Sequence, residues 1–381
     1  MAEPTLGFAV IGATGLFAST YLDAAGAVPE LELRAIAARR EQPLREVSAA
    51  YGHPDIHTRW QAVLERHDID VVAVVTSNAE HCPITLAALR AGKHVICEKP
   101  LANTAADARA MYAAAVAARR GHVVGHFMRL SEPVRMVKQL LDADELGEVQ
   151  ALFAYIWAAR APHEPAQWWM TAAECPAGSM GLIGVHFVDL ARYLTDSEVL
   201  RVFAHLPTLV TQRPDLGAIS RRAANAWSAA RPDGSLDGLP MTSVDASDYG
   251  TLHAVLANGA LLTISAGQTT FTRPGPLPDL QVHGTRASAF VYLGDGRLAP
   301  AVRLVRGTDG ALADVPLREQ ASYRAQNARM FRDEIIPALR GRAEGREGYA
   351  AASFYDGWKA AEVIDAALVA HQTGAWADVG G

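Results

Sequence analysis

In the first 127 residues, short apolar runs alternate with stretches whose apolar residues recur at helical spacing. Continuous apolar runs are typical of strands buried on both faces, and helical stretches between them indicate βα units. The pattern predicts strands at 6–11, 31–37, 69–75, 94–97 and 122–127. It predicts helices through Tyr21, from Pro43 to Gly52, from Pro83 to Gly92, and after the capping pair Thr104 and Asp107. We therefore expect a parallel α/β sheet in this part of the chain.

The pattern changes after about Gly147. Strands joined by short turns are predicted at 149–157, 249–256, 261–266 and 280–283. Asn258-Gly259 is a strong hairpin signal. Residues 211–243 are polar and contain Gly and Pro, which predicts a long loop or insertion, and 348–370 is helical. We expect two domains, 1–127 and 128–381, the second an α+β domain with an antiparallel or mixed sheet. The helix near 350–370 is a candidate to pack back on the first domain.

Composition and cysteine spacing argue against nucleic-acid binding, a disulfide framework and a metal site. The 381 residues carry a net charge of −6, which gives no support for nucleic-acid binding. Cys82, Cys97 and Cys175 fit neither a disulfide framework nor a metal knuckle, so we expect reduced thiols in a cytoplasmic protein. No signal peptide or membrane span is predicted. His122 and His126 are four apart on a predicted strand, so no metal site is expected.

A glycine turn follows the first predicted strand. It reads Gly12-Ala13-Thr14-Gly15-Leu16, and a helix follows it. Strand, glycine turn and helix together form a site for a pyrophosphate, because backbone N–H groups and the helix N-terminus face the anion. The spacing fits G-x-x-G-x-x-A better than G-x-G-x-x-G, so a plain strand–turn–helix remains the alternative.

The residues after the second predicted strand bear on the choice of cofactor. An acidic residue there would bind the ribose 2′-hydroxyl of NAD, whereas arginine accommodates the 2′-phosphate of NADP. Ala38 is neutral, and Arg39 and Arg40 follow it. The sequence therefore favours NADP over NAD. The alternative is that both arginines belong to a solvated loop.

The apolar run 94–97 ends at the triplet Glu98-Lys99-Pro100. In open α/β sheets ligands bind at the carboxyl ends of strands, so Lys99 is a candidate for proton chemistry. A solvated surface turn is the alternative on the triplet alone. The preceding predicted strand ends in a further group of polar residues, at the expected switch region of the sheet. Its members are Thr76, Ser77, Asn78 and His81.

Together these motifs resemble the glucose–fructose oxidoreductase, inositol dehydrogenase and rhizopine-catabolism family, known as Gfo/Idh/MocA. The resemblance also rests on Leu146-Gly147-Glu148-Val149, on Gly184-Val185-His186 and on Asp189. It implies a Rossmann domain and a C-terminal domain with a large, mainly antiparallel open sheet. It further implies a soluble homodimer or homotetramer assembled through that sheet, without nucleic acid or membrane partners.

The resemblance also implies hydride transfer between NADP or NAD and a hydroxyl or keto carbon of a sugar, cyclitol or related molecule. Lys99 would hydrogen-bond the reacting oxygen, and His186 would exchange its proton. Glu98 and Lys99 would both border the cofactor. An imidazole that titrates near neutrality suits proton exchange, and a cation stabilises developing alkoxide charge.

One position departs from the family pattern. Leu182 stands where an aspartate usually lies, four residues before His186. Asp189 is a possible substitute. The departure leaves open a ketone reductase, a dehydrogenase that uses Lys99 and His186 alone, or a non-catalytic nucleotide-binding sensor. A lyase or glycosidase that uses tightly bound NAD for transient oxidation is a further alternative.

Further substrate-binding candidates carry aromatic or charged side chains. They are Arg129, Arg160, Trp168, Trp169 and Asp189. Aromatic faces pack against sugar C–H surfaces, although a tryptophan pair buried in a core is an equal alternative. Arg129 could orient the lysine region or form a domain-interface ion pair.

Overall fold

The computed structural model describes residues 4–157, 163–268, 279–294, 299–307, 310–318 and 322–380. The chain forms two compact units. One comprises Met1–Leu130 and Glu319–Trp358, and the other comprises Ser131–Arg318 and Lys359–Gly381. The expected boundary between residues 127 and 128 stays a prediction.

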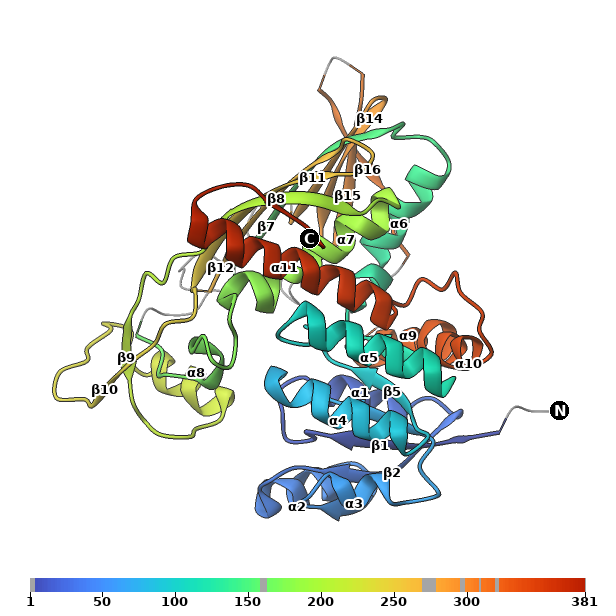
Figure 1. Ribbon diagram of the computed structural model, residues 1–381, viewed down its shortest axis with the longest axis vertical. Coiled ribbons are helices and arrows are strands. Elements are labelled where there is room, and N and C mark those ends of the chain that lie inside the picture. Colours follow the sequence, from blue (N-terminus) through green and yellow to red (C-terminus); the bar gives the residue numbers. More distant parts are fainter. Residues whose placement is uncertain are drawn as a thin grey trace. The chain divides into compact units, whose positions relative to one another are not determined.

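The first unit is built on a six-stranded sheet (Figure 1). Its strands are β1 (Leu6–Ile11), β2 (Leu31–Ala37), β3 (Asp55–His57), β4 (Val71–Val74), β5 (His94–Cys97) and β6 (His122–Val124). They lie in the order β3-β2-β1-β4-β5-β6, and every pair is parallel. This is the strand order of a Rossmann fold, whose ligand site lies where the order reverses, beside β1 and β4. The predicted fold of the first part of the chain is confirmed.

Helices connect these strands. They are α1 (Ala18–Ala25), α2 (Glu41–Ala50), α3 (Gln61–Leu64), α4 (Asn78–Arg90) and α5 (Ala105–Ala118). The capping pair at the start of α5 is confirmed, because the Asp107 N–H donates to Thr104 Oγ1 at 3.1 Å. The predicted start of α4 at Pro83 was wrong. Proline is common in a first helical turn, but here it lies inside a helix that begins after Ser77.

The predicted strand 122–127 was too long. β6 ends at Val124, and a 3₁₀ helix follows at Phe127–Leu130. Gly125 explains the break, because a Cβ there would lie 3.1 Å from Glu98 Oε2. A side chain at Gly125 would crowd the Glu98 carboxylate, so glycine lets the chain pass close to it before it turns away from the sheet.

A segment from the end of the chain completes the first unit. It contains α9 (Tyr323–Met330), a π-helical turn (Phe331–Ile335) and α10 (Ile336–Ala343). Phe331, Ile335 and Leu339 are at most 1% exposed and belong to one core cluster with Phe8 and Tyr21. The helix predicted over 348–370 is observed as α11 (Phe354–Thr373).

The second unit is built on a nine-stranded sheet. The strand order is β16-β15-β14-β13-β7-β12-β11-β8-β17. The strands are β7 (Val149–Trp157), β8 (Val199–His205), β11 (Tyr249–Leu256), β12 (Leu261–Gly267), β13 (Leu280–Gly284), β14 (Ala287–Tyr292), β15 (Ala301–Arg306), β16 (Leu312–Val315) and β17 (Ala377–Asp378). The β7–β12 pair is parallel and the other pairs are antiparallel, so the predicted mainly antiparallel open sheet is confirmed.

Helices α6 (Glu132–Asp142) and α7 (Val185–Thr195) pack on this sheet, α6 against β14 and β15 and α7 against β7. The Asn258-Gly259 hairpin is confirmed between β11 and β12, with Gly259 at φ +86°. Among the described residues, no helix is long and apolar enough to cross a membrane.

The loop expected over residues 211–243 was wrong in part. The segment forms a two-stranded sheet from β9 (Gln212–Pro214) and β10 (Met241–Ser243), with α8 (Arg221–Ala229) between them (Figure 1). Ser220 caps α8 by accepting from the Ala223 N–H. The polar composition of this segment does not predict a helix, because α8 buries little more than Ala224 and so lacks an apolar face.

Candidate active site

The glycine turn lies directly after β1. Gly12 has φ +93°, and a Cβ there would lie 2.2 Å from the Val75 carbonyl oxygen, so only glycine fits. The Gly12 and Ala13 N–H groups both donate to the Ala37 carbonyl, at 2.8 and 3.1 Å, which joins the turn to the end of β2. Beyond Gly15 the turn is open, and the Leu16 and Phe17 side chains are 52% and 47% exposed. An open turn leading into α1 fits the pyrophosphate of a dinucleotide.

Three residues at the carboxyl end of β2 are predicted to border the ribose of the cofactor. Ala38 is half-buried, and its N–H donates to the His57 carbonyl at 3.2 Å. Arg39 and Arg40 are exposed, and Arg40 forms the N-cap of α2. Two exposed arginines therefore follow this strand end, and their contact with a 2′-phosphate stays a prediction.

The triplet Glu98-Lys99-Pro100 lies at the carboxyl end of β5. Glu98 is 8% exposed and accepts from Tyr21 Oη at 2.8 Å and from the Lys99 N–H at 3.1 Å. Burial raises the pKa of the Glu98 carboxyl, and the Lys99 ammonium and the Tyr21 hydrogen bond oppose that rise. Lys99 is half-buried, and its ammonium lies 5.6 Å from the centre of the Phe17 ring. The triplet therefore contacts α1 beside the glycine turn.

The polar residues after β4 lie next to the triplet Glu98-Lys99-Pro100. Thr76 is half-buried, Ser77 is the N-cap of α4, and Asn78 is 4% exposed. His81 is 1% exposed, with Nδ1 2.8 Å from the Pro100 carbonyl oxygen and Nε2 3.3 Å from that of Thr76. Burial lowers the pKa of His81 to about 4, so the imidazole is neutral at pH 7. His81 joins the β4 end to the triplet, and its contact with a cofactor stays a prediction.

Arg129 lies in the first unit and is 4% exposed. Its guanidinium pairs with Asp356 Oδ1 at 2.9 Å, and Asp356 also accepts from the Ser353 N–H at the start of α11. This pair joins the 3₁₀ helix after β6 to the C-terminal segment of the same unit. Its role toward substrate stays a prediction.

His186 and Leu182 lie in the second unit. His186 is half-buried in the first turn of α7, and Leu182 is half-buried in the π-helical turn Met180–Gly184 that precedes α7. Isolated π-helical turns are frequent at functional sites. Asp189, one turn further along α7, is 1% exposed. The imidazole thus lies at the N-terminal end of a buried helix.

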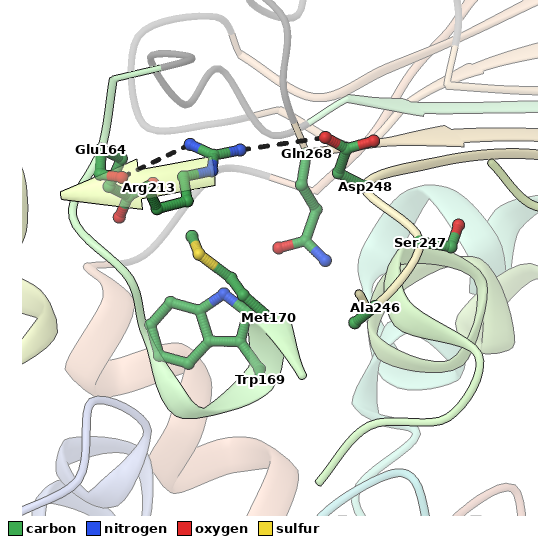
Figure 2. Close-up of a pocket in the computed structure, with 8 residues that line it drawn as sticks. All are labelled: Glu164, Trp169, Met170, Arg213, Ala246, Ser247, Asp248 and Gln268. Atoms are coloured by element: carbon green, nitrogen blue, oxygen red, sulfur yellow. Dashed lines mark hydrogen bonds and ion pairs between the residues drawn. The ribbon is translucent and has the colours of Figure 1, made fainter. Parts of the chain in front are cut away.

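A small cavity of about 20 Å³ lies in the second unit (Figure 2). Its lining residues are Glu164, Trp169, Met170, Arg213, Ala246, Ser247, Asp248 and Gln268. The Arg213 guanidinium, 2% exposed, lies 3.9 Å from Asp248 Oδ2 and contacts the Glu164 carbonyl oxygen at 3.5 Å. Trp169 and Met170 line the opposite side. A cavity of this size holds one water or one hydroxyl group.

The two predicted tryptophans differ in environment. Trp169 is 7% exposed and lines the cavity, while Trp168 is 40% exposed and meets Trp169 edge-on at 5.5 Å. Arg160 lies outside the described residues. The sequence did not predict Arg213 and Asp248 as site residues. Arg213 lies in the segment expected to be a loop, and Asp248 lies just before β11. Tyr21 and Phe17 were also missed, since a helix pattern does not show which strand end a side chain reaches.

The fold and the site of the first unit define a dinucleotide-binding α/β protein with a lysine at the carboxyl end of β5, the strand next to the switch point. Residues 6–126 match the model of an oxidoreductase family with an NAD-binding Rossmann fold, and residues 134–290 match the GFO/IDH/MocA C-terminal domain. The chain belongs to the Gfo/Idh/MocA family of oxidoreductases, as its resemblance to that family predicted, and its cofactor is a nicotinamide dinucleotide.

Individual relatives agree with this assignment. The chain is 30% identical to levoglucosan dehydrogenase of Pseudarthrobacter phenanthrenivorans over 68% of this chain and 65% of that protein, just under two thirds of its length. It is 32% identical to dTDP-3,4-didehydro-2,6-dideoxy-alpha-D-glucose 3-reductase of Streptomyces violaceoruber, over 69% of this chain and 72% of the relative.

Solved structures share the fold. An oxidoreductase domain protein from Kribbella flavida superposes with a TM-score of 0.81 at 24% identity, covering 100% of both chains. Levoglucosan dehydrogenase in complex with NADH and levoglucosan gives a TM-score of 0.81 at 23% identity, covering 98% of this chain and 99% of that one.

Proposed function

We propose that this protein transfers a hydride between a nicotinamide cofactor and a hydroxyl or keto carbon of a sugar, cyclitol or related small molecule. The observation that carries the proposal is Lys99, held at the end of β5 beside the open glycine turn of a Gfo/Idh/MocA Rossmann unit. The named relatives are dehydrogenases and reductases, and they do not favour the sensor or lyase alternatives.

Two side chains divide the proton chemistry in this proposal. The Lys99 ammonium hydrogen-bonds the reacting oxygen and stabilises negative charge that develops on it. His186 accepts or returns the hydroxyl proton. The bound nicotinamide supplies or accepts the hydride, while the protein fixes positions and fields. With Leu182 unable to accept a proton, the imidazole acts without a carboxylate at that position.

The cavity lined by Trp169 supports a polar, hydroxylated substrate. Its lining combines an indole ring with the charged groups of Glu164, Arg213 and Asp248. Aromatic faces pack against sugar C–H surfaces, and carboxylates and guanidinium groups hydrogen-bond hydroxyls. We propose that Trp168, Trp169 and Asp189 border the substrate.

We also propose that NADP is preferred over NAD. Arg39 and Arg40 are exposed at the end of β2, where no acidic residue replaces them. A guanidinium binds a 2′-phosphate through charge-assisted hydrogen bonds, whereas the ribose hydroxyls of NAD lack that charge.

The decisive experiment is a screen of sugars, cyclitols and their keto forms with both cofactors, followed at the nicotinamide absorbance. We expect Lys99→Ala and His186→Ala each to lower turnover by at least about a hundredfold, the effect typical of losing a general acid or base. Cofactor binding, measured by fluorescence titration, should stay largely intact and should be tighter for NADPH than for NADH. Lys138→Ala, which removes a lysine paired with Asp196 on the second unit, is the matched control.

Unchanged turnover in Lys99→Ala would refute the catalytic assignment. Tighter binding of NADH than of NADPH would refute the cofactor preference and leave the catalytic assignment untouched.

A further inference from the structure

Helix α1 directs two aromatic side chains at the triplet Glu98-Lys99-Pro100. Phe17 is the N-cap of α1, and Tyr21 lies four residues on, so both rings project from one side of the helix. The Phe17 ring lies under the Lys99 ammonium at 5.6 Å, and Tyr21 Oη donates to Glu98 Oε1 at 2.8 Å. Each member of the acid–base pair therefore has its own aromatic contact on the same helix.

Tyr21 is fixed rigidly by the core. It is 0% exposed; its ring meets Phe331 edge-on at 5.8 Å and Phe127 at a tilt of 54° at 5.9 Å. Only the hydroxyl group leaves the apolar cluster, and it reaches the Glu98 carboxylate. A buried hydroxyl in a rigid ring gives its acceptor a defined position.

The Glu98 carboxylate is in turn held from two sides. Tyr21 donates to Oε1 and the Lys99 N–H donates to Oε2 at 3.1 Å. Gly125 packs close behind Oε2, where even a Cβ would come within 3.1 Å. The carboxylate has little freedom to rotate, so its charge stays fixed beside the Lys99 backbone.

Phe17 shows a different kind of contact. Its ring is 47% exposed at the glycine turn, at a position where the nucleotide-binding pattern would place a small residue. The face of an aromatic ring attracts a cation. A half-exposed ring at this place therefore restricts a flexible lysine side chain that would otherwise sample many rotamers.

We propose that Phe17 and Tyr21 are positioning residues that hold the Lys99 ammonium at the carboxyl end of β5, Phe17 by direct contact and Tyr21 through Glu98. The inference rests on the proposed function for its consequence in turnover, because small misplacements of a catalytic group cost large factors in rate. The geometric claim concerns Lys99 itself and can be measured without a substrate.

The test uses the full chain with Phe17→Leu, which keeps an apolar side chain but removes the ring, and Tyr21→Phe, which removes only the hydroxyl. Phe17→Trp should restore the cation contact. Tyr51→Phe is the matched control, because it also removes a single hydroxyl in the first unit, one that donates to Asp23 Oδ1 at 3.1 Å and not to Glu98.

The first readout is the rate at which acetic anhydride acetylates Lys99, compared with Lys138 in the same sample by mass spectrometry. Loss of the ring or of the hydroxyl leaves the ammonium less stabilised and more mobile. We expect about threefold or faster acetylation of Lys99 in Phe17→Leu and Tyr21→Phe, consistent with the strength of a cation–π contact. Phe17→Trp and Tyr51→Phe should match the wild type.

The second readout is the pH profile of kcat and of KM, measured on the substrate that the screen identifies. Tyr21→Phe removes a donor to Glu98, so the acidic limb of the kcat profile should move to higher pH. Besides Tyr21, the titratable groups that act on Glu98 are the Lys99 ammonium and the Cys97 thiol, and neither changes in the variant. Phe17→Leu should lower kcat with little change in the KM for cofactor.

Equal acetylation of Lys99 in the wild type, Phe17→Leu and Tyr21→Phe would overturn the inference, whether or not a substrate is known. Faster acetylation in both variants, together with turnover that does not depend on Lys99, would keep the positioning claim and instead remove the proposed function.

Discussion

Gly12 is the residue on which the glycine turn depends. It combines a positive φ with a close approach to the Val75 carbonyl, and both exclude a side chain. Gly52 provides a comparison within the same unit, because it has φ +81° but nothing within 4 Å of a Cβ. The two positions separate backbone strain from steric exclusion.

We expect Gly52→Ala to lower the free energy of unfolding by about 1 kcal/mol, the usual cost of a left-handed conformation for alanine. Gly12→Ala should lower it by more than about 3 kcal/mol and should weaken cofactor binding, because the turn must shift away from Val75. Urea unfolding and fluorescence titration measure the two effects. Equal losses in both variants would show that strain alone governs the turn.

At the scale of elements, α4 and β6 each bury a histidine in the first unit. Burial lowers the pKa of His81 to about 4 and that of His122 to about 3. His122 packs against Tyr112 and Phe354, at 5.8 and 5.2 Å between ring centres. Both imidazoles fold in the neutral form, so their protonation opposes folding.

The sign of the pH effect follows from these pKa values. The two imidazoles take up protons near pH 6.5 in the unfolded chain but only near pH 3–4 in the folded chain. Their contribution to the free energy of unfolding is therefore complete above pH 6.5 and is lost as the pH falls from 6.5 to about 3–4. We expect each histidine to cost on the order of 3 kcal/mol between pH 7 and pH 4. In His122→Phe the free energy of unfolding should fall less over this range than in the wild type, whereas exposed His67→Phe should behave as the wild type does. Parallel urea curves for His122→Phe and the wild type would contradict the assignment.

Elements that carry their own pattern could be predicted from the sequence. The correctly predicted elements depend on residues that are neighbours in the chain. They include β1, the glycine turn, β5 and the hairpin at Asn258-Gly259. α8 was missed because its polar surface resembles a loop. The contacts of Tyr21 with Glu98 and of Phe17 with Lys99 join residues far apart in the chain, and no local periodicity encodes them. The cavity at Arg213 was not predicted for the same reason, because its lining residues are also far apart in the chain.

At the scale of the whole molecule, we propose that the nine-stranded sheet joins copies of the chain. Leu152 and Ala154 of β7 are buried, while the alternate residues Phe153 and Tyr155 are only half-buried. Phe290 of β14 is also half-buried and lies on the same sheet face as Phe153, because both pair with Gln281 of the intervening strand β13. A sheet face rich in partly exposed aromatic side chains is typical of a protein–protein interface.

Light scattering should therefore give the mass of a dimer or tetramer. Phe153→Glu combined with Phe290→Glu should yield monomers, since both changes place charge in the centre of the proposed contact. Val369→Glu, at an exposed apolar position of α11, is the control. A monomeric wild type, or an unchanged mass in the double variant, would exclude this sheet face as the interface.

The discontinuous first unit has a consequence for biosynthesis. Its core needs Phe331, Ile335 and Leu339, about two hundred residues after the last strand of its sheet. A ribosome releases the amino end first and adds about 5–20 residues each second. The nucleotide-binding sheet therefore spends on the order of ten seconds or more with one apolar side uncovered. The nascent chain should therefore be a chaperone client until nearly all of it has emerged, and a stop codon late in the gene should harm the first unit as much as the second.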